Sequence, residues 1–352
     1  MNNVTTIGID LAKNVFQVCG VDSRGKTLFQ KPLSRTKLSA FMAQHPSVLV
    51  GMEACGGAHH WARTFTEFGH VVKLMPPQYV KPYVKTHKND AHDALACAEA
   101  VTRPNMRFVP IKTSAQQDLL SLHRVRSFFI KQRTAIMNHT RGLLAEQGIT
   151  CQITLGFLLR KLLEVIDDGS FVLSPLSKTM FRELYDEIKH VDEKVKRYTK
   201  QIEQFARADH HCQLLQTIIG IGPLTSTALV ASIGNGSGFD SGRGLSAWLG
   251  LVPKQHSSGG KERLLGISKR GDCYIRQLAV HGARSVVKAA LIKDKQDKHS
   301  LWIRSLVERC GKNKATVALA NKNVRIAWAV LTQGTMFNPE LAHRDSRDIK
   351  SH

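Results

Sequence analysis

Short apolar runs separated by turn residues predict that the first third of the chain is rich in strands. Thr5–Asp22 contains β-branched and apolar runs, and the turn at Ser23–Lys26 leads into a further run at Thr27–Gln30. This pattern predicts a β-hairpin that continues into a third strand. Ser47–Glu53 and Val71–Met75 are short apolar runs of the buried type, so two more strands are predicted there.

Helical spacing alternates with these strands. A helix is predicted around Trp61–Phe68, and Asp90–Val101 is rich in alanine with apolar residues three and four positions apart. Strands that alternate with helices in this way are typical of an α/β domain.

Two long stretches with few helix breakers fill the middle of the chain, at Ala115–Gln147 and Phe181–Ala208. The second has an apolar seam with the three-or-four spacing of a coiled coil. The seam consists of Leu184, Ile188, Val191, Val195, Tyr198, Ile202 and Phe205. Turn residues in Gly148–Pro175 predict a connector between the two helices. The pair is expected to form an antiparallel stalk or an oligomerisation arm, and a simple helical hairpin packed on the rest of the chain is the alternative.

The pattern changes again in the last third. Leu214–Gly234 predicts a helix, a tight glycine turn and a second helix, and a loop rich in Gly, Ser and basic residues follows at 254–272. Two further helices are predicted at about Tyr274–Ile292 and Ala315–Thr332. The expected domains are 1–112 (α/β), 113–210 (long helical, coiled-coil middle), 211–335 (mainly α) and a flexible tail at 336–352.

The net charge of the chain says more about its function than its overall composition does. Of the 352 residues 42% are hydrophobic and 22% charged, as in an ordinary folded protein, but 50 Lys and Arg against 28 Asp and Glu give a net charge of +22. The excess is present in every third of the chain. It suggests a polyanionic partner, most often a nucleic acid, and a generically basic protein is the alternative.

Other features exclude several classes of protein. The longest apolar runs are broken by Gly, Pro and Thr, and no basic region with an apolar stretch opens the chain. We therefore expect no membrane span and no secretory signal. The seven cysteines lie far apart without a Cys-x-x-Cys pair, which argues against a zinc site and a disulfide framework. Reduced, mostly buried thiols in a cytoplasmic protein are expected.

Four acids stand where isolated carboxylates are unexpected. Asp10 and Glu53 end apolar strands, where burial without a partner is costly. Asp90 and Asp93 are three positions apart and project from one helix face, although Asp90 alone is also a good N-cap. If the four converge, they form a hard oxygen site suited to Mg²⁺, whose two-ion form promotes phosphodiester chemistry.

The sequence around these acids resembles a known family. Gly8–Lys13 (GIDLAK), Met52–Gly56 (MEACG) and Lys88–Ala94 (KNDAHDA) are similar to the three N-terminal motifs of IS110/IS1111 transposases, with Asn89 in place of the usual threonine. The resemblance implies an RNase H-like domain related to the RuvC resolvases. It also implies that the four acids are the metal-binding DEDD set.

The last third supports the same resemblance. Leu249–Pro253 (LGLVP), His256–Gly260 (HSSGG) and Gly266–Gly271 (GISKRG) are similar to the family's C-terminal transposase domain. In that family a serine of the Ser-Gly motif is the nucleophile, so Ser258 is the candidate and Ser257 the alternative. A serine hydroxyl needs activation, and the nearby cations suit a phosphoryl transition state. A loop that only contacts phosphate is the other interpretation.

Ten residues are candidates for binding nucleic acid. The stretch Leu119–Ala145 has no acid, and its cations form a basic stripe or a solvated surface face. Ile219–Pro223 (IGIGP) resembles a helix-hairpin-helix turn, which points backbone N–H groups at phosphate, or else serves packing alone. The candidates are Arg124, Arg126, Lys131 and Arg133 on the stripe, Gly220 and Gly222 in the turn, and Lys261, Arg263, Lys269 and Arg270 in the serine loop.

The resemblance implies a transposase that cuts and rejoins DNA at element ends and target, with Mg²⁺ (or Mn²⁺) and a covalent serine–DNA intermediate. It further implies a homo-oligomer (dimer or tetramer) with a site composed from two protomers, and a guide RNA encoded by the element. Three alternatives stay open at this point. They are a RuvC-like structure-selective endonuclease that uses the acids alone, a non-enzymatic nucleic-acid-binding protein, and a sugar-kinase-like phosphotransferase.

Overall fold

The computed structural model describes residues 4–84, 89–167, 171, 173–292 and 296–339. The chain divides into two compact units, Met1–Ala115 and Gln116–His352. In the described part of the chain, every helix is too short or too polar to cross a bilayer. The cytoplasmic location and the four-part division of the chain stay predictions, and most of the tail lies outside the described residues.

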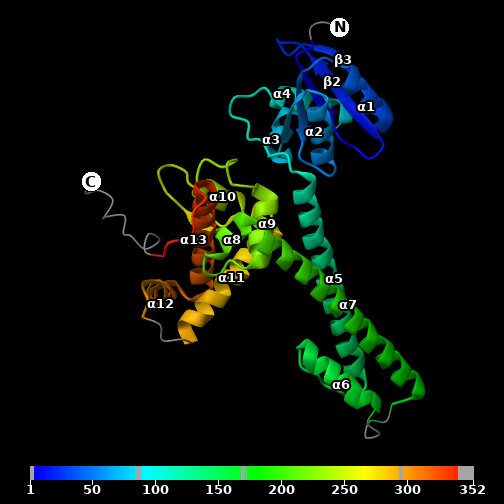
Figure 1. The fold of residues 1–352 in the computed structure, drawn as a ribbon, viewed down its shortest axis with the longest axis vertical. Coiled ribbons are helices and arrows are strands. Elements are labelled where there is room, and N and C mark those ends of the chain that lie inside the picture. Colours follow the sequence, from blue (N-terminus) through cyan, green and yellow to red (C-terminus); the bar gives the residue numbers. More distant parts are fainter. Residues whose placement is uncertain (1–3, 85–88, 168–170, 172, 293–295, 340–352) are drawn as a thin grey trace. The chain divides into compact units, whose positions relative to one another are not determined.

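The first unit is built on a mixed five-stranded sheet with the strand order β3-β2-β1-β4-β5 (Figure 1). The strands are β1 (Thr6–Asp10), β2 (Val15–Val21), β3 (Thr27–Ser34), β4 (Leu49–Glu53) and β5 (Val71–Met75). The β1–β2–β3 pairs are antiparallel, as a hairpin that continues into a third strand requires, and the β1–β4–β5 pairs are parallel. The five predicted strands and the α/β class are confirmed.

Helices cover both faces of this sheet. They are α1 (Arg35–Gln44), α2 (Ala58–Glu67), α3 (Pro77–Val80), the 3₁₀ turn η1 (Lys81–Tyr83) and α4 (Asp90–Ala100). The α1 helix was not predicted from the sequence. Ile7 and Ile9 of β1 and Val50 and Met52 of β4 are fully buried in one cluster with the apolar residues of α1 and α2. Since side chains alternate along a strand, the residues between them face α4.

Two glycines allow α4 to lie directly on the sheet. Gly8 of β1 and Gly51 of β4 are register partners. A Cβ atom added to Gly8 would lie 2.1 Å from the carbonyl oxygen of Ala94, and one added to Gly51 would lie 2.7 Å from that of Cys97. Side chains on both strands would therefore push the helix backbone away.

Gly8→Ala is expected to displace α4 and to lower the free energy of unfolding of the first unit by about 2 kcal/mol or more, because the added methyl group meets helix backbone that cannot move locally. Denaturant unfolding measures this loss. Gly56→Ala is the matched control, since a Cβ atom at Gly56 has no neighbour within 4 Å. Equal stability of the two variants would contradict the close approach of α4.

The second unit is mainly α-helical and carries one β-hairpin. Its helices are α5 (Ser114–Glu146), α6 (Leu155–Asp167), α7 (Pro175–Ala208), α8 (His210–Gln216), α9 (Pro223–Ile233), α10 (Gly242–Trp248), α11 (Cys273–Ile292), α12 (Lys298–Cys310) and α13 (Lys312–Gln333). Its strands are β6 (Pro253–Gln255) and β7 (Leu264–Ile267). Two corrections follow: the predicted connector contains the whole of α6, and the predicted loop at 254–272 contains a hairpin.

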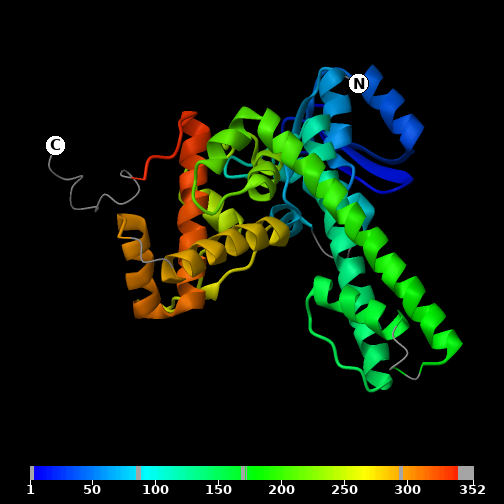
Figure 2. The same cartoon turned by 60° about the horizontal axis from the view of Figure 1, so that its bottom comes forward.

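The long helices α5 and α7 run antiparallel, as Figures 1 and 2 show. An ion pair joins Arg133 to Asp192, and Arg126 Nε donates a hydrogen bond to Thr199 Oγ1 at 2.7 Å. The α6 helix packs at the far end of the pair, where Leu158 and other apolar side chains of α5, α6 and α7 form a closed cluster. The antiparallel pairing of the two long helices is confirmed, and oligomerisation through them stays a prediction.

The prediction of the apolar seam on α7 is wrong at its last residue, Phe205. Phe205 is 46% exposed, and the neighbouring Ala206 is buried instead. A strict seven-residue repeat drifts by about 20° per heptad on a straight helix, so three heptads after Leu184 the buried stripe has moved by one residue.

The expectation of mostly buried cysteines is also wrong. All seven thiols are free, but Cys55 and Cys273 are exposed, and Cys151 and Cys310 are partly so.

A buried histidine joins α5 to two other helices of the second unit. His123 is 1% exposed, and its two ring nitrogens lie 2.9 Å from Tyr274 Oη and 3.0 Å from Thr227 Oγ1. Burial, together with the positive charge of Arg126, lowers the pKa of His123 from 6.5 to about 4. The imidazole is therefore neutral in the folded protein at neutral pH.

This depressed pKa makes the second unit sensitive to acid. Below about pH 6.5 the unfolded chain binds a proton at His123, whereas the folded chain binds it only near pH 4. The free energy of unfolding is therefore highest above pH 6.5 and decreases as the pH falls toward 4. We expect a loss of about 2 kcal/mol between pH 7 and pH 4.5 from this group. His123→Gln should remove this part of the pH dependence of unfolding, and the exposed His139→Gln should keep it. Identical pH profiles for both variants would contradict this assignment.

Candidate functional site

The predicted acids of the first unit lie at one end of the sheet. Ile9 of β1 pairs with Met52 of β4, so the next residues, Asp10 and Glu53, end neighbouring parallel strands on the face that α4 covers. Gly8 and Gly51 stand two residues earlier on the same face. The contact that brings α4 onto these glycines therefore also brings its N-terminus to the two strand ends.

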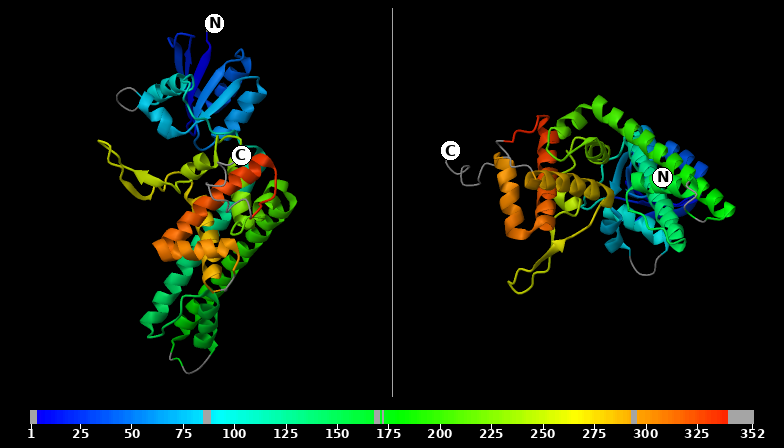
Figure 3. Two further views of the ribbon diagram at one scale, coloured as in Figure 1. Left: turned by 90° about the vertical axis from the view of Figure 1, so that its left-hand side faces the viewer. Right: turned by 90° about the horizontal axis from the view of Figure 1, so that it is seen from below.

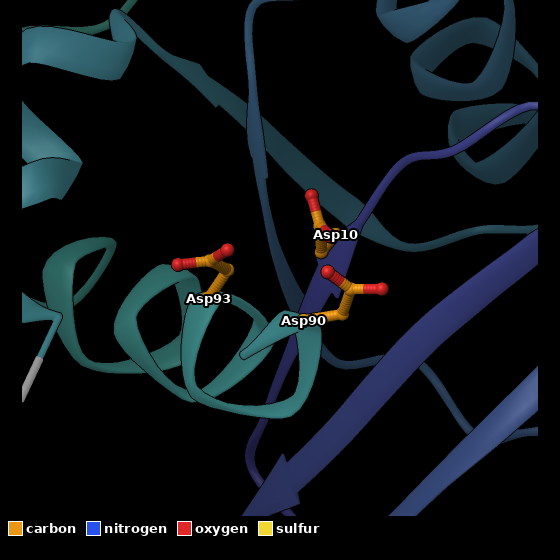
Figure 4. Close-up of side chains that lie close together, drawn as sticks. All are labelled: Asp10, Asp90 and Asp93. Carbon is orange, nitrogen blue, oxygen red and sulfur yellow. The ribbon is translucent and has the colours of Figure 1, made fainter. Parts of the chain in front are cut away.

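Three carboxylates converge there. Oxygen atoms of Asp10, Asp90 and Asp93 all lie within 4.8 Å of one another, and Figure 4 shows them at the end of β1 and the first turn of α4. Asn89 caps the helix by accepting the Ala91 N–H at 3.1 Å. The alternative role of Asp90 as the N-cap therefore does not hold, and its side chain belongs to the cluster. Like charges this close repel unless a cation separates them, and hard oxygen donors suit a divalent ion such as Mg²⁺.

Glu53 lies outside this cluster, but its negative charge acts on the same buried thiol, Cys97, as the charges of Asp10 and Asp93. Burial raises the pKa of the Cys97 thiol well above its usual value, and the negative charges of Glu53, Asp10 and Asp93 raise it further. One buried thiol thus senses three of the four predicted acids. The structure brings three acids to within ligand distance and leaves the fourth at the adjacent strand end.

The predicted nucleophile stands at the tip of the β6–β7 hairpin, which projects from the helices of the second unit in Figure 3. Ser258 pairs with Lys261 across a two-residue turn, and the Lys261 N–H donates to the Ser258 carbonyl oxygen at 3.1 Å. Gly259 and Gly260 both have positive φ, 56° and 78°, as a type I′ turn requires. Ser258 and its neighbours at this tip are exposed.

The register gives the hairpin two different faces. Gln255 pairs with Leu264, and the His256 N–H donates to the carbonyl oxygen of Arg263, in the same register as Ser258 and Lys261. Because side chains alternate along each strand, Ser258 shares one face with His256, Lys261 and Arg263.

Ser257 lies on the opposite face with Glu262, and its hydroxyl accepts a hydrogen bond from Gln255 Nε2 at 3.0 Å. The two candidate serines therefore stand in surroundings of opposite charge.

The base of the hairpin is held by residues that sequence reasoning missed. Arg276 of α11 donates to the carbonyl oxygens of Leu249 and Arg270, both at 2.9 Å, and Asn321 of α13 donates to that of Leu251 at 3.1 Å. Lys269 adopts a left-handed backbone with φ of 55°. In the sequence, the one signal for the anchoring role of Arg276 is its spacing after the Ser-Lys-Arg-Gly motif. The exposed cations Lys261, Arg263, Lys269 and Arg270 are thus presented on an anchored hairpin.

The predicted glycine turn precedes α9. Gly220 has φ of 96° and packs against Gly282 of α11, while Asn323 donates to the Ile219 carbonyl oxygen at 2.9 Å. Gly222 is exposed and forms the N-cap of α9. One side of the turn is therefore buried in packing, and the side at Gly222 reaches solvent.

The four cations predicted on α5 divide between two faces. Arg126 and Arg133 point toward α7, where they bind Thr199 and Asp192. Arg124 and Lys131, seven positions apart, are exposed. Only this second pair lies open to solvent as a basic stripe would.

The mixed sheet, with three carboxylates gathered between the end of β1 and the first turn of α4, characterises the first unit as an RNase H-like domain with a candidate metal site. Family models agree: a DEDD transposase model of the IS110 type matches residues 7–148, and a model described as "Transposase IS116/IS110/IS902 family" matches residues 212–298.

Full-length relatives extend the match. The chain is 46% identical to a probable family 20 transposase of Pseudomonas aeruginosa, over 96% of this chain and 99% of that protein. It is 45% identical to the transposase of insertion sequence element IS1111A of Coxiella burnetii, over 95% and 91%. It is 24% identical to a pilin gene-inverting protein of Moraxella bovis, over 96% and 98%.

The chain belongs to the IS110/IS1111 family of transposases, enzymes that cut and join DNA. The resemblance drawn from the motifs is confirmed, as is the RNase H-like class of the first unit. The sugar-kinase-like and non-enzymatic alternatives are set aside, and a DNA partner follows from the activity.

The acid cluster predicts a measurable metal site. Asp10→Asn and Asp93→Asn are each expected to weaken Mn²⁺ binding at least about tenfold, because each removes a charged oxygen donor. Electron paramagnetic resonance of free Mn²⁺ reports the affinity without any catalysis. Glu67→Gln, an exposed acid at the end of α2, should leave the affinity within about twofold. Equal affinities for all four proteins would disprove the site.

Proposed function

We propose that this transposase exchanges DNA strands through a covalent intermediate on Ser258, with Asp10, Glu53, Asp90 and Asp93 holding Mg²⁺ (or Mn²⁺). The observation that carries this proposal is the register of the β6–β7 hairpin, which sets Ser258 on the cationic face of an anchored turn. Two ions at such a site would activate the attacking oxygen and stabilise the leaving one.

The charge of the hairpin faces favours Ser258 over Ser257. A phosphodiester carries negative charge that spreads over its oxygens during transfer. Lys261 and Arg263 on the Ser258 face attract that charge, whereas Glu262 on the Ser257 face repels it. The Ser257 hydroxyl is in addition engaged by Gln255.

The reaction conserves the number of phosphodiester bonds. The Ser258 hydroxyl loses its proton and attacks the phosphorus, a serine–DNA ester forms, and one deoxyribose oxygen leaves and takes up a proton. A deoxyribose hydroxyl of a second strand then attacks the same phosphorus and releases the serine. Because each step replaces one ester by another, the exchange needs no external source of energy.

The acids fit this role by their chemistry. Asp10, Asp90 and Asp93 already lie within ligand distance of one another. Glu53 stands at the end of the neighbouring strand, and we propose it as the fourth ligand. The positive end of the α4 dipole favours negative charge at this place.

Several partners belong to the same proposal. The family resemblance implies a guide RNA encoded by the element, a homo-oligomer, and a composite site that joins the acids of one protomer to the serine of another. The separate units that carry the acids and the serine are compatible with such a site. The excess of 22 positive charges supports polyanionic partners, and a cytoplasmic location is part of the same proposal.

The proposed nucleic-acid contacts differ in character. Lys261, Arg263, Lys269 and Arg270 would neutralise phosphates beside the reacting bond. The exposed pair Arg124 and Lys131 would contact a backbone along α5, while Arg126 and Arg133 would act through their contacts with α7. Gly222 would offer a backbone N–H at the start of α9, with Gly220 shaping that turn.

Ser258→Ala is expected to abolish a covalent protein–DNA adduct, because no other oxygen at the hairpin tip shares the cationic face. The adduct is trapped under denaturing conditions from purified protein, labelled element-junction and target DNA, the flanking RNA and Mg²⁺. Ser257→Ala is the matched control and should retain the adduct. Loss of the adduct in Ser257→Ala alone would move the nucleophile to Ser257.

The same assay separates the remaining alternative. DNA that is nicked with Mg²⁺ without an adduct, equally in wild type and Ser258→Ala, would indicate hydrolysis by the acids alone, as in a structure-selective endonuclease. Asp10→Ala should abolish cleavage under either mechanism while nucleic-acid binding persists.

A further inference from the structure

The middle of the helical hairpin is a band without carboxylates. On α5 no Asp or Glu stands anywhere in Leu119–Ala145, and on α7 none stands in Lys194–Ile202. The contacts of Arg126 with Thr199 and of Phe129 with Tyr198 bring these two stretches to the same level of the antiparallel pair. Two segments far apart in the sequence therefore combine into one positive surface.

We call this surface the stalk band and define it as residues 124–131 of α5 and 194–201 of α7. Its cations are Arg124, Arg126, Lys131, Lys194, Lys196, Arg197 and Lys200. Lys196 also pairs with Asp192, at 2.9 Å, just outside the band.

An aromatic cluster stands in the centre of the band. Phe129 and Tyr198 stack across the two helices with ring centroids 5.7 Å apart. Lys194 lies over the Phe129 ring at 5.1 Å, and Arg197 lies over the Tyr198 ring at 5.4 Å. Phe128 meets Phe129 edge-on at 5.3 Å and is itself 60% exposed. The cluster therefore holds one aromatic ring, that of Phe128, largely exposed to solvent.

The exposed ring lies between exposed cations. Arg124, Phe128 and Lys131 are four and three residues apart, so they share one face of α5. A single exposed apolar residue needs no explanation. An exposed ring fixed by a neighbouring stack, with a cation one turn away on each side, is the combination that binds single-stranded nucleic acids, because bases stack on the ring while cations follow the backbone.

We propose that the stalk band is a docking surface for a single-stranded segment of RNA, with one unpaired base stacked on Phe128 and its flanking phosphates on Arg124 and Lys131. The inference rests on the proposed function, in which RNA is a partner. RNA is favoured because its loops present unpaired bases, whereas DNA reaches the enzyme as a duplex with its bases stacked inside.

Charge argues against a second copy of this chain as the occupant. An isologous contact through the stalk band would set the cations of one protomer against the same cations of the other. No carboxylate in either stretch of the band would relieve the repulsion. A polyanion meets no such penalty.

Photo-cross-linking of the full-length protein tests the site directly. A single-stranded RNA oligonucleotide with 5-iodouridine substitutions is irradiated with the protein, and the tryptic peptides are sequenced by mass spectrometry. We expect a cross-link within Ser127–Lys131, the tryptic peptide that contains Phe128. The same strand in a fully paired duplex should give none there.

Affinity measurements with variants test the stacking itself. Phe128→Leu keeps an apolar side chain without the π face, and it should weaken binding of the single-stranded RNA by about five- to 100-fold while duplex affinity stays within about twofold. Phe128→Trp should restore the affinity. Phe205→Leu is the matched control, since Phe205 is an exposed phenylalanine of α7 outside the stalk band, and it should change nothing.

Three results would overturn the proposal. An equal loss for single strand and duplex would assign the band to backbone contacts alone. Tighter binding and cross-linking of a single-stranded DNA than of the RNA would assign it to DNA. Unchanged RNA affinity, with dissociation of an oligomer in sedimentation analysis of Phe128→Leu, would assign it to a second copy. Since each readout is binding or assembly, the outcome is independent of whether Ser258 forms an adduct.

Discussion

The contact between α4 and the two glycines of the central strands is the constraint on which the candidate metal site depends. Gly8 and Gly51 face the helix backbone without side chains, so the helix lies closer to the sheet than any other residue pair would permit. Asp10 and Glu53 follow two residues later on the same strands. The first turn of α4 therefore meets the strand ends, and Asp90 and Asp93 reach Asp10. Close backbone packing, rather than any attraction among the acids, brings mutually repelling carboxylates together.

The second unit uses a different means to present its serine. Ser258 stands on an exposed two-residue turn, where rigidity has to come from the base of the hairpin. Arg276 and Asn321 supply it by donating to backbone carbonyl oxygens on the base, from helices that are themselves buried in the core. The acids and the serine are thus each held firmly within their own unit.

Much of this arrangement could be predicted from the sequence, for identifiable reasons. Strand ends with unexpected carboxylates and a helix with acids three positions apart indicated the metal site, because burying unpaired charge is costly. The α6 helix escaped prediction because its apolar stripe gains meaning only when α5 and α7 are present to cover it. The motif match favoured Ser258 but left Ser257 open. The proposal for Ser258 adds the hairpin register, which spacing along the sequence does not show, and a slip of one residue would exchange the two faces.

The distribution of charge links these elements. Phosphodiester exchange needs no energy input, so the enzyme's task is to hold several polyanions in register, and its positive charge is arranged accordingly. Four acids stand where metal ions would bring them into contact with phosphate, and none stands in the stalk band, where backbone and bases would bind without metal. Arg126 and Arg133 show the remaining use of cations, since they join α5 to α7 and so fix the antiparallel register that assembles the band. Cations therefore both hold α5 against α7 and provide the positive charge of the stalk band.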